Sequence, residues 1–184
     1  SISPKSYNNK YGVPLSLLNI RENDEFGVLE VGMDKKGEID HLTRIIKPEV
    51  SVITNINFAH AKNFKNIKQI AMAKSEIIQN TKLGGFVVLN ADDNFFNLHK
   101  RIAIKNNLRF ISFGIRNKNS NVKFLGIKNK GKYFKLYIQV NRLKKYFLVS
   151  NNFHNNIYNI LAALAIMSIY INISQLSKNI FLKF

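Results

Sequence analysis

The chain has 184 residues, 46% of them hydrophobic, and it contains no cysteine. This apolar content indicates a folded protein with a sizeable core and excludes an intrinsically disordered chain. The lack of cysteine excludes a disulfide framework and a thiolate metal centre. No secretory signal is visible, and because the sequence starts at Ser1 and not at Met, we expect a fragment or a processed product.

The formal net charge of +17 is unevenly distributed. All 11 acidic residues lie between Glu22 and Asp93, whereas residues 94–184 contain 16 of the 28 Lys and Arg residues. Basic surfaces of this size are found in proteins that bind nucleic acid or anionic lipid. Lysine far outnumbers arginine, however, and Asn and Ile are frequent too, which favours a solvated face with a compositional bias. We therefore expect no nucleic-acid partner, and a basic nucleic-acid-binding module is the weaker alternative.

Proline residues and turn formers divide the first part of the chain. Pro14 fits the first turn of a helix, and Pro48 ends one, because proline disfavours the helical conformation in the residue before it. The run VSVITN at 50–55 is β-branched and mostly apolar, as expected of a buried parallel strand. We predict, in order, a loop over 1–13, a helix over 14–19, a strand over 26–31, a helix over 38–46 and a strand over 50–55.

The alternation of strands and helices continues to residue 113. Apolar residues follow helical spacing over 66–80, and Gly84-Gly85 ends that segment. Asp92 or Asp93 is placed to cap the next helix, which we expect to reach about Asn106. Strands are predicted over 86–89 and 109–113. The alternation predicts an α/β fold, a doubly wound and mainly parallel sheet with flanking helices.

The pattern changes near Gly114. Three runs with alternating hydrophobicity, at 121–127, 133–140 and 143–149, predict a small antiparallel β-subsheet within 115–150 that is attached to the main sheet. The apolar run over 155–171 is shorter than the roughly 20 residues of a membrane span and is interrupted by polar residues, so we expect a buried helix. A last helix is expected to start near Ser174.

Three polar side chains stand just beyond apolar runs. Glu30 ends the first predicted strand, His60 follows the second, and Lys74 lies in the next helix. Ligand sites of open α/β sheets lie at the carboxyl ends of strands, so these side chains are candidates for an active-site lining. A carboxylate and an imidazole bind divalent cations, and a lysine supplies metal-binding oxygens once CO₂ has converted it to a carbamate. Taken singly, a Glu at a strand end, a lone His or a helical Lys more often has a structural or solvent-facing role than a catalytic one.

Several spaced motifs resemble the central domain of the Mur ligases, the ATP-dependent amino-acid-adding enzymes of peptidoglycan synthesis. The motifs are E-V-G-x-x-x-x-G-E-I (30–39), K-P-x-V-x-V-I-T-N-I-x-x-A-H (47–60), I-A-x-A-K-x-E-I (70–77) and L-N-A-D-D (89–93). The stretch N-N-x-x-G-V-P-L-S-L-L (8–18) resembles the branch that adds D-alanyl-D-alanine to a UDP-N-acetylmuramoyl-tripeptide. The stretch N-I-Y-N-I-L-A-A (156–163) is similar to the family's asparagine-bearing helix.

The resemblance implies a monomeric, cytoplasmic bacterial ligase that uses ATP and Mg²⁺. ATP would phosphorylate the terminal carboxylate of the tripeptide, and the amine of D-alanyl-D-alanine would attack the acyl phosphate. The resemblance implies that Glu30, His60 and a carbamylated Lys74 bind the metal, with His60 and Lys74 also catalytic. ATP would be bound by Asn156, Asn159, Asn90 and Asp92. The UDP-muramoyl-peptide would be bound by Asn8 and Asn9. Asn8 and Asn9 are alternatively suited to simple turn hydrogen bonds.

One family motif is missing. The phosphate-binding loop G-x-x-G-K-[ST] does not occur in the sequence. We expect it upstream of Ser1 and interpret 1–184 as a central, ATP-binding domain that is incomplete at its N-terminus and lacks the family's N-terminal UDP-binding and C-terminal domains. On this interpretation the chain alone has no ligase activity. The alternatives are another Mur-type amino-acid ligase and a non-catalytic paralogue.

Overall fold

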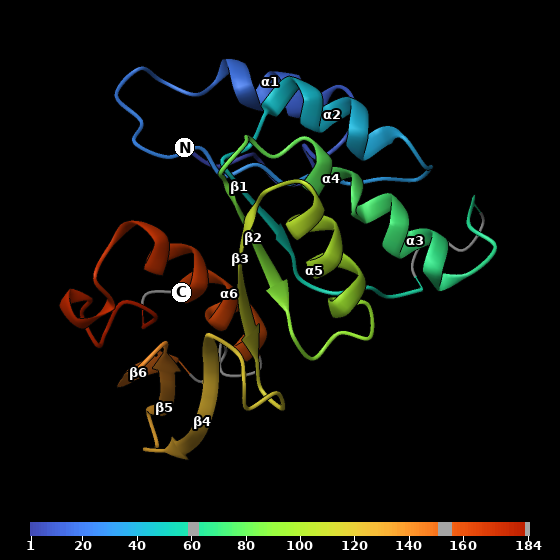
Figure 1. Cartoon of the computed structure of the whole chain (residues 1–184). Coiled ribbons are helices and arrows are strands. Elements are labelled where there is room, and N and C mark those ends of the chain that lie inside the picture. The colour runs from blue at the N-terminus through green and yellow to red at the C-terminus, as the bar shows by residue number, and fades with distance from the viewer. Residues whose placement is uncertain (59–62, 151–155, 183–184) are drawn as a thin grey trace.

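A computed structural model describes residues 1–58, 63–150 and 156–182 of the chain. It shows a six-stranded mixed sheet with helices on both faces, which confirms the predicted α/β class (Figure 1). The strands lie side by side in chain order from β1 to β6. Each strand therefore pairs with its neighbours in sequence, and polar residues that follow consecutive strands are brought together.

The first four strands run parallel to one another. They are β1 (Val50–Ile53), β2 (Phe86–Asn90), β3 (Arg109–Gly114) and β4 (Val122–Asn129). Successive residues of β2 enter different cores: Val87 and Leu89 are buried on one face of the sheet, and Val88 on the other. Burial on both faces explains why β1 and β2 are almost continuously apolar and not alternating.

Helices α3 (Ile67–Lys74), α4 (Glu76–Gln79) and α5 (Phe96–Lys105) cover one face of the parallel strands (Figure 1). The prediction of one helix over 66–80 was wrong in one respect, because the helix is interrupted at Ser75. The Ser75 hydroxyl donates a hydrogen bond to the Met72 carbonyl at 2.6 Å. A serine side chain competes in this way with the regular helical hydrogen bonds, and the chain turns before it resumes as α4.

Glu76 follows the interruption directly and contacts the start of helix α2 (Glu38–Ile46), whose predicted bounds are confirmed. The Glu76 carboxylate is 8% exposed and accepts hydrogen bonds from the backbone N–H groups of Gly37 and Asp40, at 2.9 and 3.0 Å for its closest oxygens. Gly37 has a φ of +90°, a conformation that favours glycine. Glu76 thus takes the place of the N-cap side chain that Gly37 lacks.

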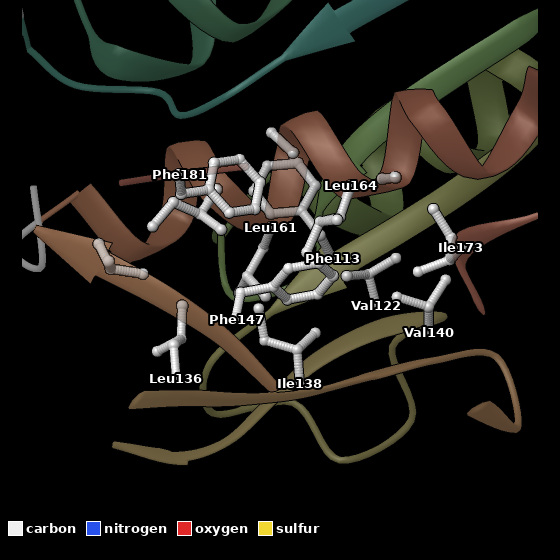
Figure 2. Close-up of a cluster of buried hydrophobic side chains, with 14 of the residues drawn as sticks. Phe113, Val122, Leu136, Ile138, Val140, Phe147, Leu161, Leu164, Ile173 and Phe181 are labelled. Carbon is white, nitrogen blue, oxygen red and sulfur yellow. The ribbon is translucent and has the colours of Figure 1, made fainter. Parts of the chain in front are cut away.

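The chain after β4 adds two antiparallel strands, β5 (Tyr133–Val140) and β6 (Leu143–Ser150). The predicted antiparallel strands are confirmed, and pairing of β3 with β4 makes them continuous with the parallel strands. Helix α6 (Ile157–Tyr170) covers this part of the sheet on the face opposite to α3–α5 (Figure 1). Figure 2 shows the core between them, in which Phe113, Leu136, Phe147, Leu161 and Leu164 are fully buried.

Two local predictions near the strands were wrong. Residues 26–31 form only an isolated parallel bridge between Ile2 and Val28, because a β-rich run becomes a strand only where a partner continues the ladder. Neither predicted aspartate caps α5, whose N-cap is Phe95. Instead Asp93 accepts the Phe95 N–H at 2.8 Å and so holds the turn that leads into the helix.

The ends of the described chain carry short helices. Helix α1 (Gly12–Leu18) confirms the helix expected around Pro14. The helix expected near Ser174 is a single turn, η3 (Ile173–Gln175), in which the Asn172 side chain accepts the Ser174 N–H. The Lys145 ammonium of β6 donates to the carbonyls of Ile173, Ser174 and Leu176 and fixes this turn to the sheet. Among the helices in the described ranges, none is both long and apolar enough to cross a membrane.

Candidate active site at the carboxyl ends of the parallel strands

Hydrogen bonds join the carboxyl ends of β1 and β2. The Asn90 side-chain amide, at the end of β2, donates to the Thr54 carbonyl beyond β1 at 3.0 Å. Asp93 accepts the backbone N–H of Ile56 at 2.8 Å. Asn90 also accepts the Asp92 N–H at 2.9 Å, so the amide fixes both loops. Asn90 and Asp93 therefore hold the loops beyond β1 and β2 together at this edge of the sheet.

Lys74 reaches this edge from the last turn of α3. Its ammonium donates to the Asn55 carbonyl at 3.0 Å, immediately beyond β1. Burial lowers the pKa of Lys74, and the negative charge of Asp93 acts in the opposite direction. A lowered pKa increases the fraction of neutral amine, the form that reacts with CO₂ to give a carbamate.

Asp92 connects the β2 loop to the loop after β3 and to α6. Its carboxylate accepts backbone N–H groups of Ile115, Arg116 and Asn117 at 2.6 to 2.9 Å, and the Tyr158 hydroxyl at 3.0 Å. Burial alone would raise the pKa of Asp92, but these hydrogen bonds outweigh it and the pKa is lowered. The same burial, followed by the contact with Asp92, raises the pKa of Tyr158. Four donors therefore hold this carboxylate in a structural network.

Asn156 and Asn159 lie at the start of α6, on either side of Tyr158 in sequence. Both side chains are exposed, and residues three apart share one face of a helix. Asn156 is the N-cap residue, yet its side chain makes no capping hydrogen bond. Because Asp92 holds Tyr158, the network fixes the helical turn that presents these two amides beside the edge of the sheet.

Glu30 and Asn8 form a second polar group, in the segment before α2. The Asn8 side-chain amide donates to Glu30 at 2.9 Å, and the Glu30 N–H donates to the Ser3 hydroxyl at 2.9 Å. Asn9 accepts the N–H groups of Tyr11 and Gly12, both at 3.0 Å, which is the turn role considered for it from the sequence. In the part of the chain that the structure describes, no hydrogen bond or ion pair joins Glu30 to Lys74.

The metal site predicted from Glu30, His60 and Lys74 stays a prediction. His60 lies outside the described residues. Within residues 1–58, 63–150 and 156–182, no three His, Asp or Glu side chains gather closely enough to hold a metal ion. Glu30 presents an exposed carboxylate, an oxygen ligand of the kind that Mg²⁺ prefers.

Several residues of this edge were missed in the sequence. Asp93 was predicted only as a helix cap. Glu76 and Tyr158 stand in the quoted motifs, but no role was predicted for them, because their partners lie far along the chain. His99 was missed too: it is 2% exposed and donates to the Ala71 carbonyl at 3.0 Å. Burial lowers the pKa of His99, so the neutral ring is favoured and the residue belongs to the core between α3 and α5.

Comparison with known proteins agrees with these motifs. The model of the Mur ligase middle domain matches residues 2–167. The chain is 33% identical over 171 residues to the UDP-N-acetylmuramoyl-tripeptide–D-alanyl-D-alanine ligase of Buchnera aphidicola subsp. Baizongia pistaciae, covering 92% of the chain and 36% of the relative. It is 42% identical over 112 residues to the Borreliella burgdorferi enzyme of the same name, covering 60% of the chain and 24% of that enzyme.

Solved structures give the same result. A crystal structure of MurF from Acinetobacter baumannii superposes with a TM-score of 0.82 at 25% identity and covers 94% of this chain and 37% of that one. MurF from Thermotoga maritima, solved in complex with ADP, has a TM-score of 0.78 at 25% identity and covers 92% and 38%. The chain thus spans roughly a quarter to two fifths of the length of the relatives that it matches.

Proposed function

The chain belongs to the Mur ligase family through the middle domain, and on that premise we propose that the complete protein joins D-alanyl-D-alanine to a UDP-N-acetylmuramoyl-tripeptide at the expense of ATP. The observation that carries this proposal is the match over 171 residues to a ligase of that name. The similarity of the fold to that of MurF, with a TM-score of 0.82 at 25% identity, also supports the proposal. We further propose that the complete protein is a monomeric cytoplasmic enzyme.

The proposed reaction has two steps. The γ-phosphoryl group of ATP moves to the terminal carboxylate of the tripeptide, which gives an acyl phosphate and ADP. The amine of D-alanyl-D-alanine then attacks the acyl carbon, and the tetrahedral intermediate expels inorganic phosphate as the amide forms. The first step brings the anionic carboxylate against the triphosphate, and the second develops negative charge on the acyl oxygen. Positive charge at the strand ends would therefore stabilise both transition states.

The proposed magnesium ligands are Glu30, His60 and a carbamylated Lys74. Glu30 offers carboxylate oxygens, His60 an imidazole nitrogen, and Lys74 carbamate oxygens after reaction with CO₂. When bound there, Mg²⁺ neutralises charge between the tripeptide carboxylate and the transferred phosphoryl group. The lowered pKa of Lys74 supports the carbamate, because the neutral amine is the reactive form.

The exposed amides of α6 are the proposed nucleotide contacts. Asn156 and Asn159 present donors and acceptors on one helical face, suited to the adenine edge of ATP. Asn90 and Asp92 would serve the nucleotide side of the site by fixing the loops beside it, since their own hydrogen-bonding groups are engaged. Asn8 would lie beside the UDP-muramoyl-peptide, with Asn9 holding the turn next to it.

The test of the proposal is ligation by the complete protein, measured as amide product and released phosphate. Lys74→Ala is expected to lower turnover by about a hundredfold or more, and short-chain carboxylic acids that replace the carbamate should restore part of it. Lys68→Ala is the matched control, because Lys68 lies on the same helix and is exposed. Unchanged turnover of Lys74→Ala would remove the carbamate from the mechanism.

His60 is tested by a magnesium titration. His60→Ala is expected to raise the Mg²⁺ concentration needed for half-maximal turnover by about tenfold or more, because one ligand is lost. The control is His41→Ala, an exposed histidine of α2. Titration curves that coincide for wild type and His60→Ala would contradict the metal role.

Substrate competition distinguishes the alternatives. Wild-type protein is expected to consume D-alanyl-D-alanine in preference to glutamate or a diamino acid offered with the matching UDP-muramoyl acceptor. Preference for another amino acid would indicate a different Mur-type ligase. No ATP-dependent ligation with any of these acceptors would indicate a non-catalytic paralogue.

A further inference from the structure

The outer face of strands β4–β6 is basic. Alternate residues of these strands point into the α6 core, so the residues between them form the opposite face. We call this surface the basic face. It consists of Lys123 and Lys128 of β4, Lys135 and Tyr137 of β5, Lys144 and Tyr146 of β6, and the adjoining Lys178.

Ammonium groups are concentrated on this face and not dispersed. The ammonium of Lys135 lies 3.7 Å from the ring centroid of Tyr146, and that of Lys178 lies 4.6 Å from the same centroid. Lys128 is directly opposite Lys135 in the β4–β5 pairing. Like charges directly opposite each other on neighbouring strands destabilise a sheet, so this face carries an unfavourable interaction that a bound anion would relieve.

No acidic residue of this part of the chain balances these charges. Residues 94–184 contain no Asp or Glu, and ten of their Lys and Arg residues lie within 115–150. A bias toward lysine, asparagine and isoleucine explains frequent lysine, but it does not explain why every acidic residue is confined to 22–93. Carboxylate side chains of residues 94–184 therefore supply no complement to the basic face.

We propose that the basic face docks on the anionic surface of a lipid bilayer. A single face of a β-sheet places its ammonium groups side by side, as contact with a bilayer surface requires, and each lysine near an anionic bilayer strengthens binding by about fivefold. This docking is independent of the ligase chemistry proposed above.

Single-stranded nucleic acid fits the basic face less well. Such partners are bound by stacking bases on open aromatic faces and by a groove that follows the phosphates. Here two ammonium groups lie against the Tyr146 ring, and Lys135 is also 5.6 Å from the centroid of Tyr137. The face contains no arginine among its defining residues, whereas arginine is the usual bidentate ligand of phosphate.

The test is sedimentation of the complete protein with vesicles. Wild type is expected to bind vesicles that contain phosphatidylglycerol and not vesicles of phosphatidylcholine alone, and added salt should weaken the binding. The triple variant Lys128→Gln/Lys135→Gln/Lys144→Gln is expected to bind about a hundredfold more weakly. The same positions changed to arginine should retain binding, because the charge is kept.

The matched control is Lys35→Gln/Lys36→Gln/Lys68→Gln, which removes three exposed lysines outside the basic face and should bind within about threefold of wild type. Thermal unfolding checks that each variant folds, and Lys128→Gln/Lys144→Gln, at two exposed positions, serves if the triple variant does not. Equal binding to both vesicle types, or full binding by the glutamine variant, would overturn the proposal. So would a single-stranded RNA oligonucleotide that displaces the protein from the vesicles at equal concentration of charge.

Discussion

The two ends of the sheet are stabilised by different interactions. The carboxyl ends of β1–β3 are held by directional hydrogen bonds from Asn90, Asp92 and Asp93 to backbone groups of neighbouring loops. The β4–β6 strands and α6 are held by apolar packing around Phe147 and Leu161 (Figure 2). The comparison predicts that substitutions at the strand ends are sensitive to residue identity, whereas substitutions in the antiparallel part are sensitive to side-chain volume.

The largest expected effect lies in the antiparallel part. Phe147 is fully buried and its ring contacts that of Phe181 with centroids 5.5 Å apart. Phe147→Ala should lower the free energy of unfolding by about 3–5 kcal/mol, because it leaves a cavity. Urea unfolding measures this, with Tyr137→Ala on the exposed face as control and an expected loss below about 1 kcal/mol. A small loss for Phe147→Ala would show that packing does not dominate this region.

The second effect tests the strand-end network. Asp92→Asn should lower the free energy of unfolding at neutral pH by about 2–3 kcal/mol, because charge-assisted hydrogen bonds to three N–H groups and the Tyr158 hydroxyl are weakened. Urea unfolding at several pH values measures it. Asn97→Asp, at an exposed position of α5, is the control for a change of one charge.

The pH dependence of this effect has a defined sign. Since the pKa of Asp92 is lowered in the folded protein, its contribution is fully present above the unfolded value of about 3.9. It is lost as the pH falls through the lower folded pKa. The stability difference between wild type and Asp92→Asn should therefore be constant near neutral pH and shrink below about pH 4. A difference that does not change with pH would contradict the network.

The smallest effect concerns a polar clamp inside the antiparallel part. Lys145 donates to three carbonyls around η3, and Lys145→Met keeps most of the aliphatic stem while removing these hydrogen bonds. The expected loss in free energy of unfolding is about 1–2 kcal/mol. Lys144→Met, at an exposed neighbouring position, should change it by less than about 0.5 kcal/mol. Equal losses in the two variants would show that the clamp contributes no stability.

Much of the fold was predictable because local patterns decided it. Helix α2 and the apolar strands β1–β3 follow from periodicity and from proline and glycine positions. The strand expected over 26–31 was not found. This segment has β propensity, but no neighbouring segment extends its pairing beyond the Ile2–Val28 bridge. The break at Ser75 depends on one side-chain hydrogen bond, which hydrophobic spacing does not report.

The candidate site was predictable only in part. The motifs named Lys74, Asn90 and Asp92, and the structure places all three at the carboxyl ends of the parallel strands. The sequence did not show that Asp92 would be saturated by four donors, or that Asp93 would hold the loop beyond β1, because those partners are distant backbone groups. Every residue type except proline has a backbone N–H group, so the amino-acid sequence does not reveal which N–H groups will bind a given carboxylate.

Glu76 links the start of α2 to the helical segment that carries Lys74. Its carboxylate binds the start of α2, the helix that directly follows the segment of Glu30, while Lys74 stands two positions before it. A buried carboxylate with bonds to two backbone groups acts as a rigid spacer of fixed length. Shortening that spacer by one methylene would displace the segment of one candidate metal ligand relative to the other, although Glu76 itself would touch neither substrate nor ion.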